Sequence, residues 1–254
     1  MATFSHNGGG LIEAESLSKV FDSAKGSAPV TVLRDVSLRV DPGEMVAIVG
    51  PSGSGKSTLL YCLAGLEPAT SGTVSLFGRD LAALRRNALA KLRRDAIGFV
   101  FQAYNLIPSL TAAENAGLPG RLARRRGAAS AARESMRAVG LSERGGFLPG
   151  RLSGGQQQRV AIARVLASGA SLVFADEPTG ALDTRTGEQV LSLLRDAASG
   201  ERSVVLVTHD LEAAARADRV LVLRDGLIHS ELIAPTAEDV LEAVRAAGEG
   251  ASAA

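Results

Sequence analysis

Residues Gly50 to Ser57 read Gly-Pro-Ser-Gly-Ser-Gly-Lys-Ser, a spacing typical of a phosphate-binding P-loop. The glycines let backbone N–H groups approach phosphate oxygens, and the start of a helix expected over Thr58 to Leu66 adds positive potential. Lys56 would neutralise the β- and γ-phosphates, and Ser57 would supply an oxygen ligand to Mg²⁺. The nucleotide-binding residues predicted here are Gly50, Pro51, Ser52, Gly53, Ser54, Gly55, Lys56, Ser57 and Thr58.

An acidic pair and a histidine follow two other apolar runs. Asp176 and Glu177 come after Leu172 to Ala175, and His209 comes after Ser203 to Val207. Asp176 would hold Mg²⁺, Glu177 would polarise the water that attacks the γ-phosphate, and His209 would contact that phosphate and water. Alone, such an acidic pair usually forms a turn or a helix cap, and a single histidine is usually structural. The P-loop favours the catalytic interpretation of both.

A second anion-binding pattern is Leu-Ser-Gly-Gly-Gln-Gln-Gln-Arg, which opens a helix expected over Gln156 to Ala167. Ser153, Gly154, Gly155 and Gln156 combine small side chains with the free N–H groups of a helix start. One nucleotide site needs only one phosphate cradle. Two cradles in one chain are explained if two chains pair head to tail, so that each closes the nucleotide site of the other.

Four short apolar runs must position these residues: Met45 to Val49, Ile97 to Phe101, Leu172 to Ala175 and Ser203 to Val207. Runs without alternation suit parallel strands buried on both faces, and ligands bind beyond the carboxyl ends of such strands. The segment Thr31 to Val40 alternates, which indicates an antiparallel sheet. The predicted fold class is α/β: a P-loop NTPase core, mostly parallel sheet with flanking helices, an N-terminal antiparallel sheet and an inserted α-helical subdomain.

We expect a single domain over residues 11–246. Its core would comprise 11–102 and 169–246, and its helical subdomain about 103–168. The Gly/Ala/Ser-rich tails, 1–10 and 247–254, are expected to be disordered.

Composition narrows the class of protein. The 254 residues are 46% hydrophobic and 22% charged, which fits a globular domain, and the net charge of +1 does not favour nucleic acid as a partner. No apolar run reaches the ~20 residues of a spanning helix, and the N-terminus lacks the features of a signal peptide. A single cysteine, Cys62, agrees with a reducing compartment.

From about Leu11 to Leu232 the sequence resembles the ATP-binding cassette (ABC) ATPases. The matching motifs occur in that family's order: the P-loop, Gln102, Leu152 to Gln156, Asp176-Glu177, Leu182-Asp183 and His209. The resemblance implies ATP and Mg²⁺ as cofactors.

The same resemblance implies further roles. Gln102 would bind Mg²⁺, take part in catalysis and sense a transmembrane partner. Ser153 and Gly155 would complete the ATP site of a second subunit, and Asp183 would couple the two sites. Phe21 stands where the family places an aromatic, commonly Tyr, against adenine; the alternative is that Phe21 is a core residue.

A narrower resemblance is to the lipoprotein-release, macrolide-export and antimicrobial-peptide-resistance branch, the MacB and LolD type. The residues that carry it are Gly98 to Gln102, Asn105 to Pro108, Glu114-Asn115 and Ala175 to Gly180. This branch pairs with permeases that have a large extracytoplasmic domain. Ala181 departs from it, because the branch usually has Asn before Leu-Asp.

The expected function is that of an ATP-hydrolysing subunit of an ABC transporter. It would dimerise around two Mg²⁺-ATP and drive a permease on a separate chain, at the cytoplasmic face of a bacterial membrane, with export or mechanical transmission of lipophilic or peptide-like cargo. The low lysine content points to a GC-rich genome. The alternatives are an amino-acid-type importer subunit, a soluble ABC ATPase acting on nucleic acid or ribosomes, and a non-hydrolysing adaptor.

Two basic clusters remain: Arg85, Arg86, Lys91, Arg93 and Arg94, and Arg121, Arg124, Arg125 and Arg126. A solvated helix face is the favoured interpretation, and contact with a permease or with anionic lipid is the alternative.

Overall fold

The computed structural model describes residues 10–22, 28–198 and 202–249. These residues form two compact units, the first comprising Met1–Leu89 with Val205–Ala254 and the second Ala90–Val204. The second unit is thus inserted in the sequence of the first, and the expected helical subdomain falls within it. Of the tails predicted to be disordered, residues 1–9 and 250–254 lie outside the described residues, whereas residues 247–249 belong to helix α8 (Ala237–Glu249), so the prediction is wrong there.

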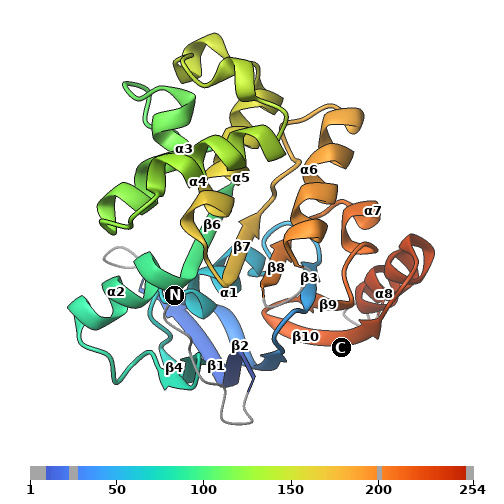
Figure 1. The fold of residues 1–254 in the computed structure, drawn as a ribbon. Coiled ribbons are helices and arrows are strands. Elements are labelled where there is room, and N and C mark those ends of the chain that lie inside the picture. The colour runs from blue at the N-terminus through green and yellow to red at the C-terminus, as the bar shows by residue number, and fades with distance from the viewer. Residues whose placement is uncertain (1–9, 23–27, 199–201, 250–254) are drawn as a thin grey trace. The chain divides into compact units, whose positions relative to one another are not determined.

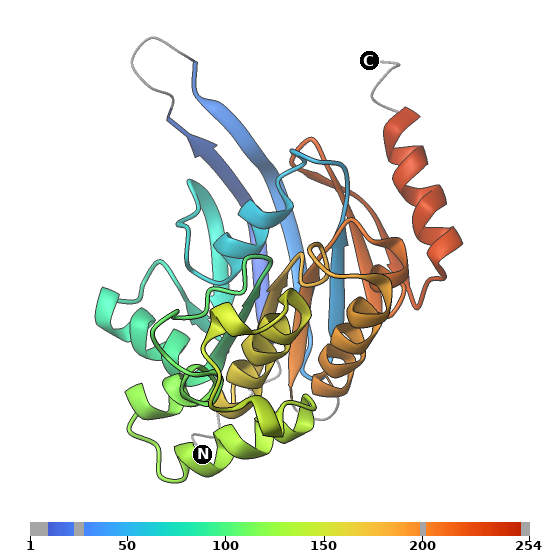
Figure 2. The ribbon, with the colours of Figure 1, turned by 90° about the horizontal axis from the view of Figure 1, so that it is seen from above.

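The first unit contains an antiparallel sheet with strand order β2-β1-β4-β5. Its strands are β1 (Ile12–Phe21), β2 (Val30–Val40), β4 (Ser71–Leu76) and β5 (Arg79–Asp80). In Figure 2, β1 and β2 run side by side, with Ile12 opposite Val40. Val36 and Val40 are buried on one face of β2, because residues an even number apart share a face; Leu33 is also buried, across an irregularity in the β1–β2 register between Leu33 and Val36. The predicted antiparallel N-terminal sheet is therefore confirmed.

A second set of strands in this unit has the order β10-β9-β3-β8. The bounds are β3 (Met45–Val49), β8 (Ser203–Val207, of which Val205 onward belongs to this unit), β9 (Arg219–Arg224) and β10 (Leu227–Ile233). Strand β9 pairs parallel with β3 and antiparallel with β10. All five residues of β3 are buried, which explains why its sequence shows no alternation. The helices are α1 (Lys56–Leu63), α7 (Leu211–Ala214) and α8 (Ala237–Glu249).

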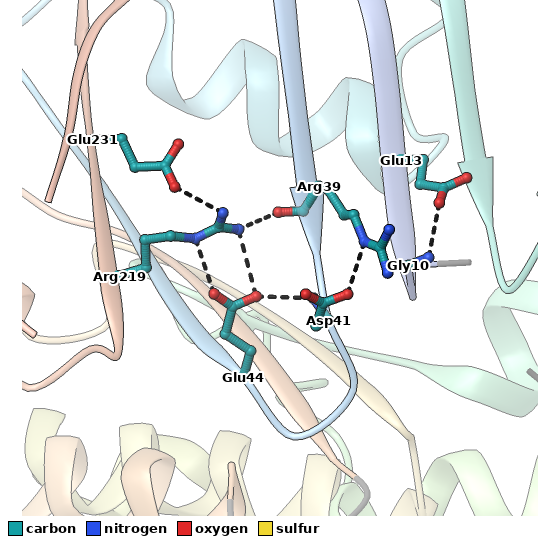
Figure 3. Close-up of polar contacts among 7 residues, drawn as sticks. All are labelled: Gly10, Glu13, Arg39, Asp41, Glu44, Arg219 and Glu231. Carbon is teal, nitrogen blue, oxygen red and sulfur yellow. Dashed lines mark hydrogen bonds and ion pairs between the residues drawn. The ribbon is translucent and has the colours of Figure 1, made fainter. Parts of the chain in front are cut away.

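A polar network holds the turn that leads into β3 (Figure 3). The Arg219 guanidinium lies 2.9 Å from a carboxylate oxygen of Glu44 and 2.9 Å from one of Glu231, and it also donates to the carbonyl of Arg39. Glu44 accepts from the backbone N–H of Asp41 at 2.8 Å. Burial raises the pKa of Glu44, although Arg219 opposes this shift. The strand that enters the P-loop is thereby tied to β2 and β9.

The second unit combines parallel strands with helices. Its elements are α2 (Arg86–Ala96, which begins in the first unit), β6 (Ile97–Phe101), α3 (Ala112–Leu122), α4 (Ala128–Ala138), η1 (Ser142–Arg144), η2 (Pro149–Arg151), α5 (Gly154–Ser168), β7 (Leu172–Asp176) and α6 (Thr184–Ala197). Strands β6 and β7 pair in parallel, and helices α3, α4 and α5 pack on one another (Figure 1). Among the residues described, no helix is both long and apolar enough to cross a membrane.

Candidate functional site

The P-loop follows β3 directly, and its glycines adopt backbone conformations that other residues avoid. Gly50, Gly53 and Gly55 have φ of +151°, +81° and +101°. A Cβ atom on Gly50 would lie 1.9 Å from the carbonyl oxygen of Leu223 on β9. No side chain fits at Gly50, so the glycine is required by both conformation and space.

Lys56 begins helix α1 and reaches back across the loop. Its Nζ donates to the carbonyls of Gly50 and Pro51, each at 2.9 Å. The first turn of α1 contains no acidic residue, so the positive end of the helix is not neutralised from within. Within the described chain, the Ser54 hydroxyl is buried without a hydrogen-bond partner. A cation, a helix N-terminus and an unused hydroxyl therefore converge on this loop, which suits a phosphate.

His209 is placed at the same strand edge as the P-loop. The backbone N–H of Thr208 donates to the carbonyl of Ile48 on β3 at 3.2 Å, so the ends of β8 and β3 are adjacent. Asp210 caps α7 and accepts from the backbone N–H of Glu212. His209 is exposed between these two anchored neighbours.

Phe21 ends β1 in the first unit. Its side chain is 39% exposed, which argues against the alternative that it is a core residue. The ammonium of Lys19 lies 4.6 Å from its ring centroid and also pairs with Glu67 at 2.6 Å. One face of the ring is thus held by a cation–π contact.

In the second unit, the register of β6 and β7 brings Gln102 near the acidic pair. Phe101 is opposite Asp176, so Gln102 and Glu177 each follow one member of that pair. Glu177 has φ of +47° and precedes Pro178, a combination that is disfavoured for a residue other than glycine. The backbone at Glu177 is therefore strained, and surrounding contacts must hold it.

Gly180 lies against the Gln102 side chain. A Cβ on Gly180 would be 3.0 Å from the Gln102 Nε2 atom, and the Gly180 N–H donates to the carbonyl of Glu177 at 3.1 Å. The turn after Glu177 and the side chain of Gln102 are therefore in contact.

Helix α5 begins with a capping box. The Ser153 hydroxyl accepts from the Gln156 N–H at 3.3 Å, and the Gln156 side chain accepts from the Ser153 N–H at 3.0 Å. A Cβ on Gly154 would be 2.8 Å from the Tyr104 hydroxyl oxygen, and one on Gly155 would be 2.4 Å from Thr186 Cγ2. The two glycines thus permit close packing as well as an open helix end.

Asp183 caps helix α6. Its carboxylate accepts from the backbone N–H of Thr186 at 3.1 Å. Hydrogen bonds from the Thr186 side chain and backbone lower the pKa of Asp183. Because Thr186 also contacts Gly155, the Asp183 turn is packed against the start of α5.

Three buried or half-buried polar residues were missed as site residues. Gln158 on α5 is fully buried and donates to the carbonyl of Pro178 at 2.6 Å, directly after Glu177. Arg164 on α5 donates to backbone carbonyls in the loop after Gln102. Asn115, which served only to identify the branch, is buried and organises the same loop. The sequence signal that could have identified these residues is a polar side chain at a position that falls on the buried face of an amphipathic helix.

Asn115 satisfies four backbone groups of the segment before α3. Its Oδ1 accepts from the Ile107 N–H at 2.8 Å, and its Nδ2 donates to the carbonyls of Ile107, Leu110 and Thr111. One buried side chain thus anchors a segment that is rich in exposed residues.

Taken unit by unit, the predicted residues fall into two groups. The first unit holds Phe21, the P-loop through Thr58, and His209. The second holds Gln102, Ser153 to Gln156, Asp176, Glu177 and Asp183, with helix α5 contacting the segments after Gln102, Glu177 and Asp183. The described residues contain no cluster of three or more His, Cys, Asp or Glu side chains placed to hold a metal on their own.

The motif order, and the geometry within each unit, are those expected of an ATP-binding cassette. A family model described as ABC transporter matches residues 33–180, more than half of the chain, and the chain therefore belongs to that family. It is an ABC-type ATPase.

Two curated proteins are similar to this chain over most of its length. The chain is 46% identical over 243 residues to the Macrolide export ATP-binding/permease protein MacB of Rhodopseudomonas palustris, covering 95% of this chain and 36% of the relative. The protein of the same name from Bradyrhizobium diazoefficiens is 50% identical over 208 residues, covering 81% and 32%. The chain thus spans about a third of the length of these curated relatives.

A solved structure is also similar. It is a dimeric structure of a post-hydrolysis state of the ATP-binding cassette MJ0796 bound to ADP and Pi, with a TM-score of 0.81 and 39% identity, covering 88% of this chain and 99% of that one. These findings confirm the predicted α/β fold class, the ABC ATPase membership and the resemblance to the MacB and LolD type.

Proposed function

We propose that this chain is the ATP-hydrolysing part of an export or mechanotransmission machine, in which two copies close head to tail around two ATP molecules. The P-loop carries this proposal. Three glycines with positive φ, Lys56 folded across the loop and a buried Ser54 hydroxyl with no hydrogen-bond partner among the described residues would form a phosphate cradle. ATP binding would exchange the carbonyl contacts of Lys56 for phosphate oxygens. The N–H groups at the start of α1 would hold the same phosphates.

By the family resemblance, the Ser57 hydroxyl, the Asp176 carboxylate and Gln102 would hold Mg²⁺, and side-chain oxygens of these kinds are the ligands that this ion prefers. When bound, it supplies positive charge against the phosphate oxygens. Glu177 would orient and polarise the attacking water, and His209 would contact the γ-phosphate side of the site. Phe21 would stack on adenine.

The second subunit would complete each site. Ser153, Gly154, Gly155 and Gln156 would face the phosphates bound to the other copy, and Asp183 would couple the two sites. The dimeric cassette at 39% identity supports this pairing. The macrolide-export names of the relatives support export over import of a small solute, and they support a permease as partner. We propose that binding to this permease places the chain at the cytoplasmic face of a bacterial membrane.

The test is Glu177→Gln, which removes a carboxylate and keeps its size. We expect phosphate release to be lost, ATP binding to be retained, and an ATP-bound dimer to accumulate in size-exclusion chromatography with light scattering. Glu188→Gln, an exposed glutamate on α6, is the matched control and should behave as wild type. Turnover at the wild-type rate in Glu177→Gln would refute the assignment of the base.

Two further measurements complete the test. Lys56→Ala should abolish ATP binding, as measured with a fluorescent nucleotide. Tagged Glu177→Gln, captured from detergent-solubilised membranes with Mg²⁺-ATP, should retain a stoichiometric permease with a large extracytoplasmic domain. Recovery with ribosomal or DNA-associated proteins instead would contradict the transporter part of the proposal.

A further inference from the structure

The segment after Gln102 is a tight turn, in which the N–H groups of Tyr104 and Asn105 donate to the carbonyls of Phe101 and Ala103. Tyr104 and Asn105 have φ of +60° and +49°, two consecutive residues other than glycine in the left-handed region. Asn tolerates this region, but Tyr has no side-chain hydrogen-bonding pattern that favours it. The left-handed backbone at Tyr104 costs free energy, which contacts from elsewhere in the unit can offset.

Such contacts come from helix α5. Arg164 donates from Nη1 to the carbonyl of Asn105 at 2.7 Å and from Nη2 to the carbonyl of Tyr104 at 3.2 Å. The planar fork of a guanidinium matches two neighbouring carbonyl oxygens, which an ammonium does not. At the start of the same helix, Gly154 lies against the Tyr104 hydroxyl. The turn is thus held to α5 at two places along the helix.

The surroundings of Arg164 do not favour a charged side chain. It lines a cavity of about 300 Å³ whose other walls include Phe99, Leu118, Leu122 and Val165. Desolvation lowers the pKa of the guanidinium. No carboxylate of the described residues pairs with it, so its partners are backbone carbonyls. The guanidinium is therefore partly desolvated and held by two backbone carbonyls, an arrangement that an apolar side chain cannot reproduce.

We propose that Arg164 is a positioning residue that clamps the Tyr104-Asn105 turn to helix α5, so that the Gln102 segment and Ser153 move as one body. Because Gln102 leads into the turn and Ser153 caps α5, a displacement of one reaches the other through this clamp. The role in ATP-driven dimer closure rests on the proposed function, whereas the clamp itself does not.

The first experiment measures the mobility of the turn in the absence of nucleotide. The chain contains no tryptophan, so Ala103→Trp, at an exposed position beside the turn, gives a single reporter. In that background we compare Arg164→Met, Arg164→Lys and, as matched control, Arg159→Met. Arg159 lies on the same helix but donates to the carbonyl of Val139. We expect lower fluorescence anisotropy and greater acrylamide quenching in Arg164→Met only, with Arg164→Lys in between.

The second experiment separates positioning from stability. Arg164→Met should keep KM for ATP within about twofold, while kcat falls by about tenfold or more beyond any loss of folded protein measured by thermal unfolding, since small misplacements in a catalytic site are costly. In a Glu177→Gln background it should also weaken the ATP-dependent dimer. Unchanged mobility of the tryptophan reporter would overturn the clamp. So would a kcat that falls only as far as the folded fraction falls.

Failure of the proposed function and failure of the Arg164 clamp can be distinguished. If the parent protein neither hydrolyses ATP nor dimerises with it, the proposed function fails while the nucleotide-free fluorescence comparison still decides the clamp. If the parent is active and Arg164→Met matches it in kcat, dimerisation and reporter mobility, the clamp fails alone.

Discussion

Replacing Gly155 by Ala puts a methyl group where helix α5 meets the Asp183 turn. The added Cβ would lie 2.4 Å from Thr186 Cγ2, well inside van der Waals contact. Thr186 is a short, β-branched side chain whose hydroxyl and backbone N–H both bond to Asp183, so it cannot turn aside without losing that bond. Gly155→Ala therefore strains the contact between Gly155 and the turn that Asp183 caps.

Two opposing effects set the magnitude. Overpacking costs about 1–3 kcal/mol, whereas Ala in place of Gly within a helix gains up to about 1 kcal/mol. The net loss in free energy of unfolding should be about 1 kcal/mol. For a chain of this size that lowers the melting temperature by about 2–4 °C.

The assay is thermal unfolding of a double-mutant cycle with Thr186→Ser, which removes the methyl group and keeps the hydroxyl. Because the clash involves only that methyl, the double variant should recover the lost stability, with a coupling of about 1–2 kcal/mol. Helix propensity alone predicts that Gly155→Ala raises the melting temperature. That result, or a coupling near zero, would refute the packing argument.

Two further predictions concern buried polar groups. Asn115→Ala should destabilise the chain by about 2–6 kcal/mol in thermal or denaturant unfolding, because four hydrogen bonds are lost at about 0.5–1.5 kcal/mol each; an unchanged stability would contradict the anchoring role. Burial raises the pKa of Cys62 from 9.0 to about 11. The unfolded thiol ionises first, so stability should fall as pH rises between these values, and Cys62→Ala should reduce that slope in melting curves. Parallel slopes in the two proteins would contradict the shift.

The strands could be predicted because their signals are local. Met45–Val49, Ile97–Phe101 and Ser203–Val207 are observed with the predicted bounds, since a run buried on both faces is apolar throughout. Strand β9 and helix α6 were not identified, because their charged ends and mixed patterns do not distinguish them from neighbouring segments. The branch resemblance was likewise visible in short contiguous motifs.

The sequence by itself determined which residue types stand ready for phosphate chemistry: the glycines and Lys56 of the P-loop, the Asp176-Glu177 pair and the Ser153 cap are each encoded within a few consecutive residues. Only the tertiary structure decided which contacts restrict substitution at particular positions. Gly50 faces the carbonyl of Leu223, Gly155 faces Thr186, and Arg164 holds the turn at Tyr104. These constraints join atoms far apart in the chain, and a contact that depends on distant atoms leaves no pattern in the local sequence.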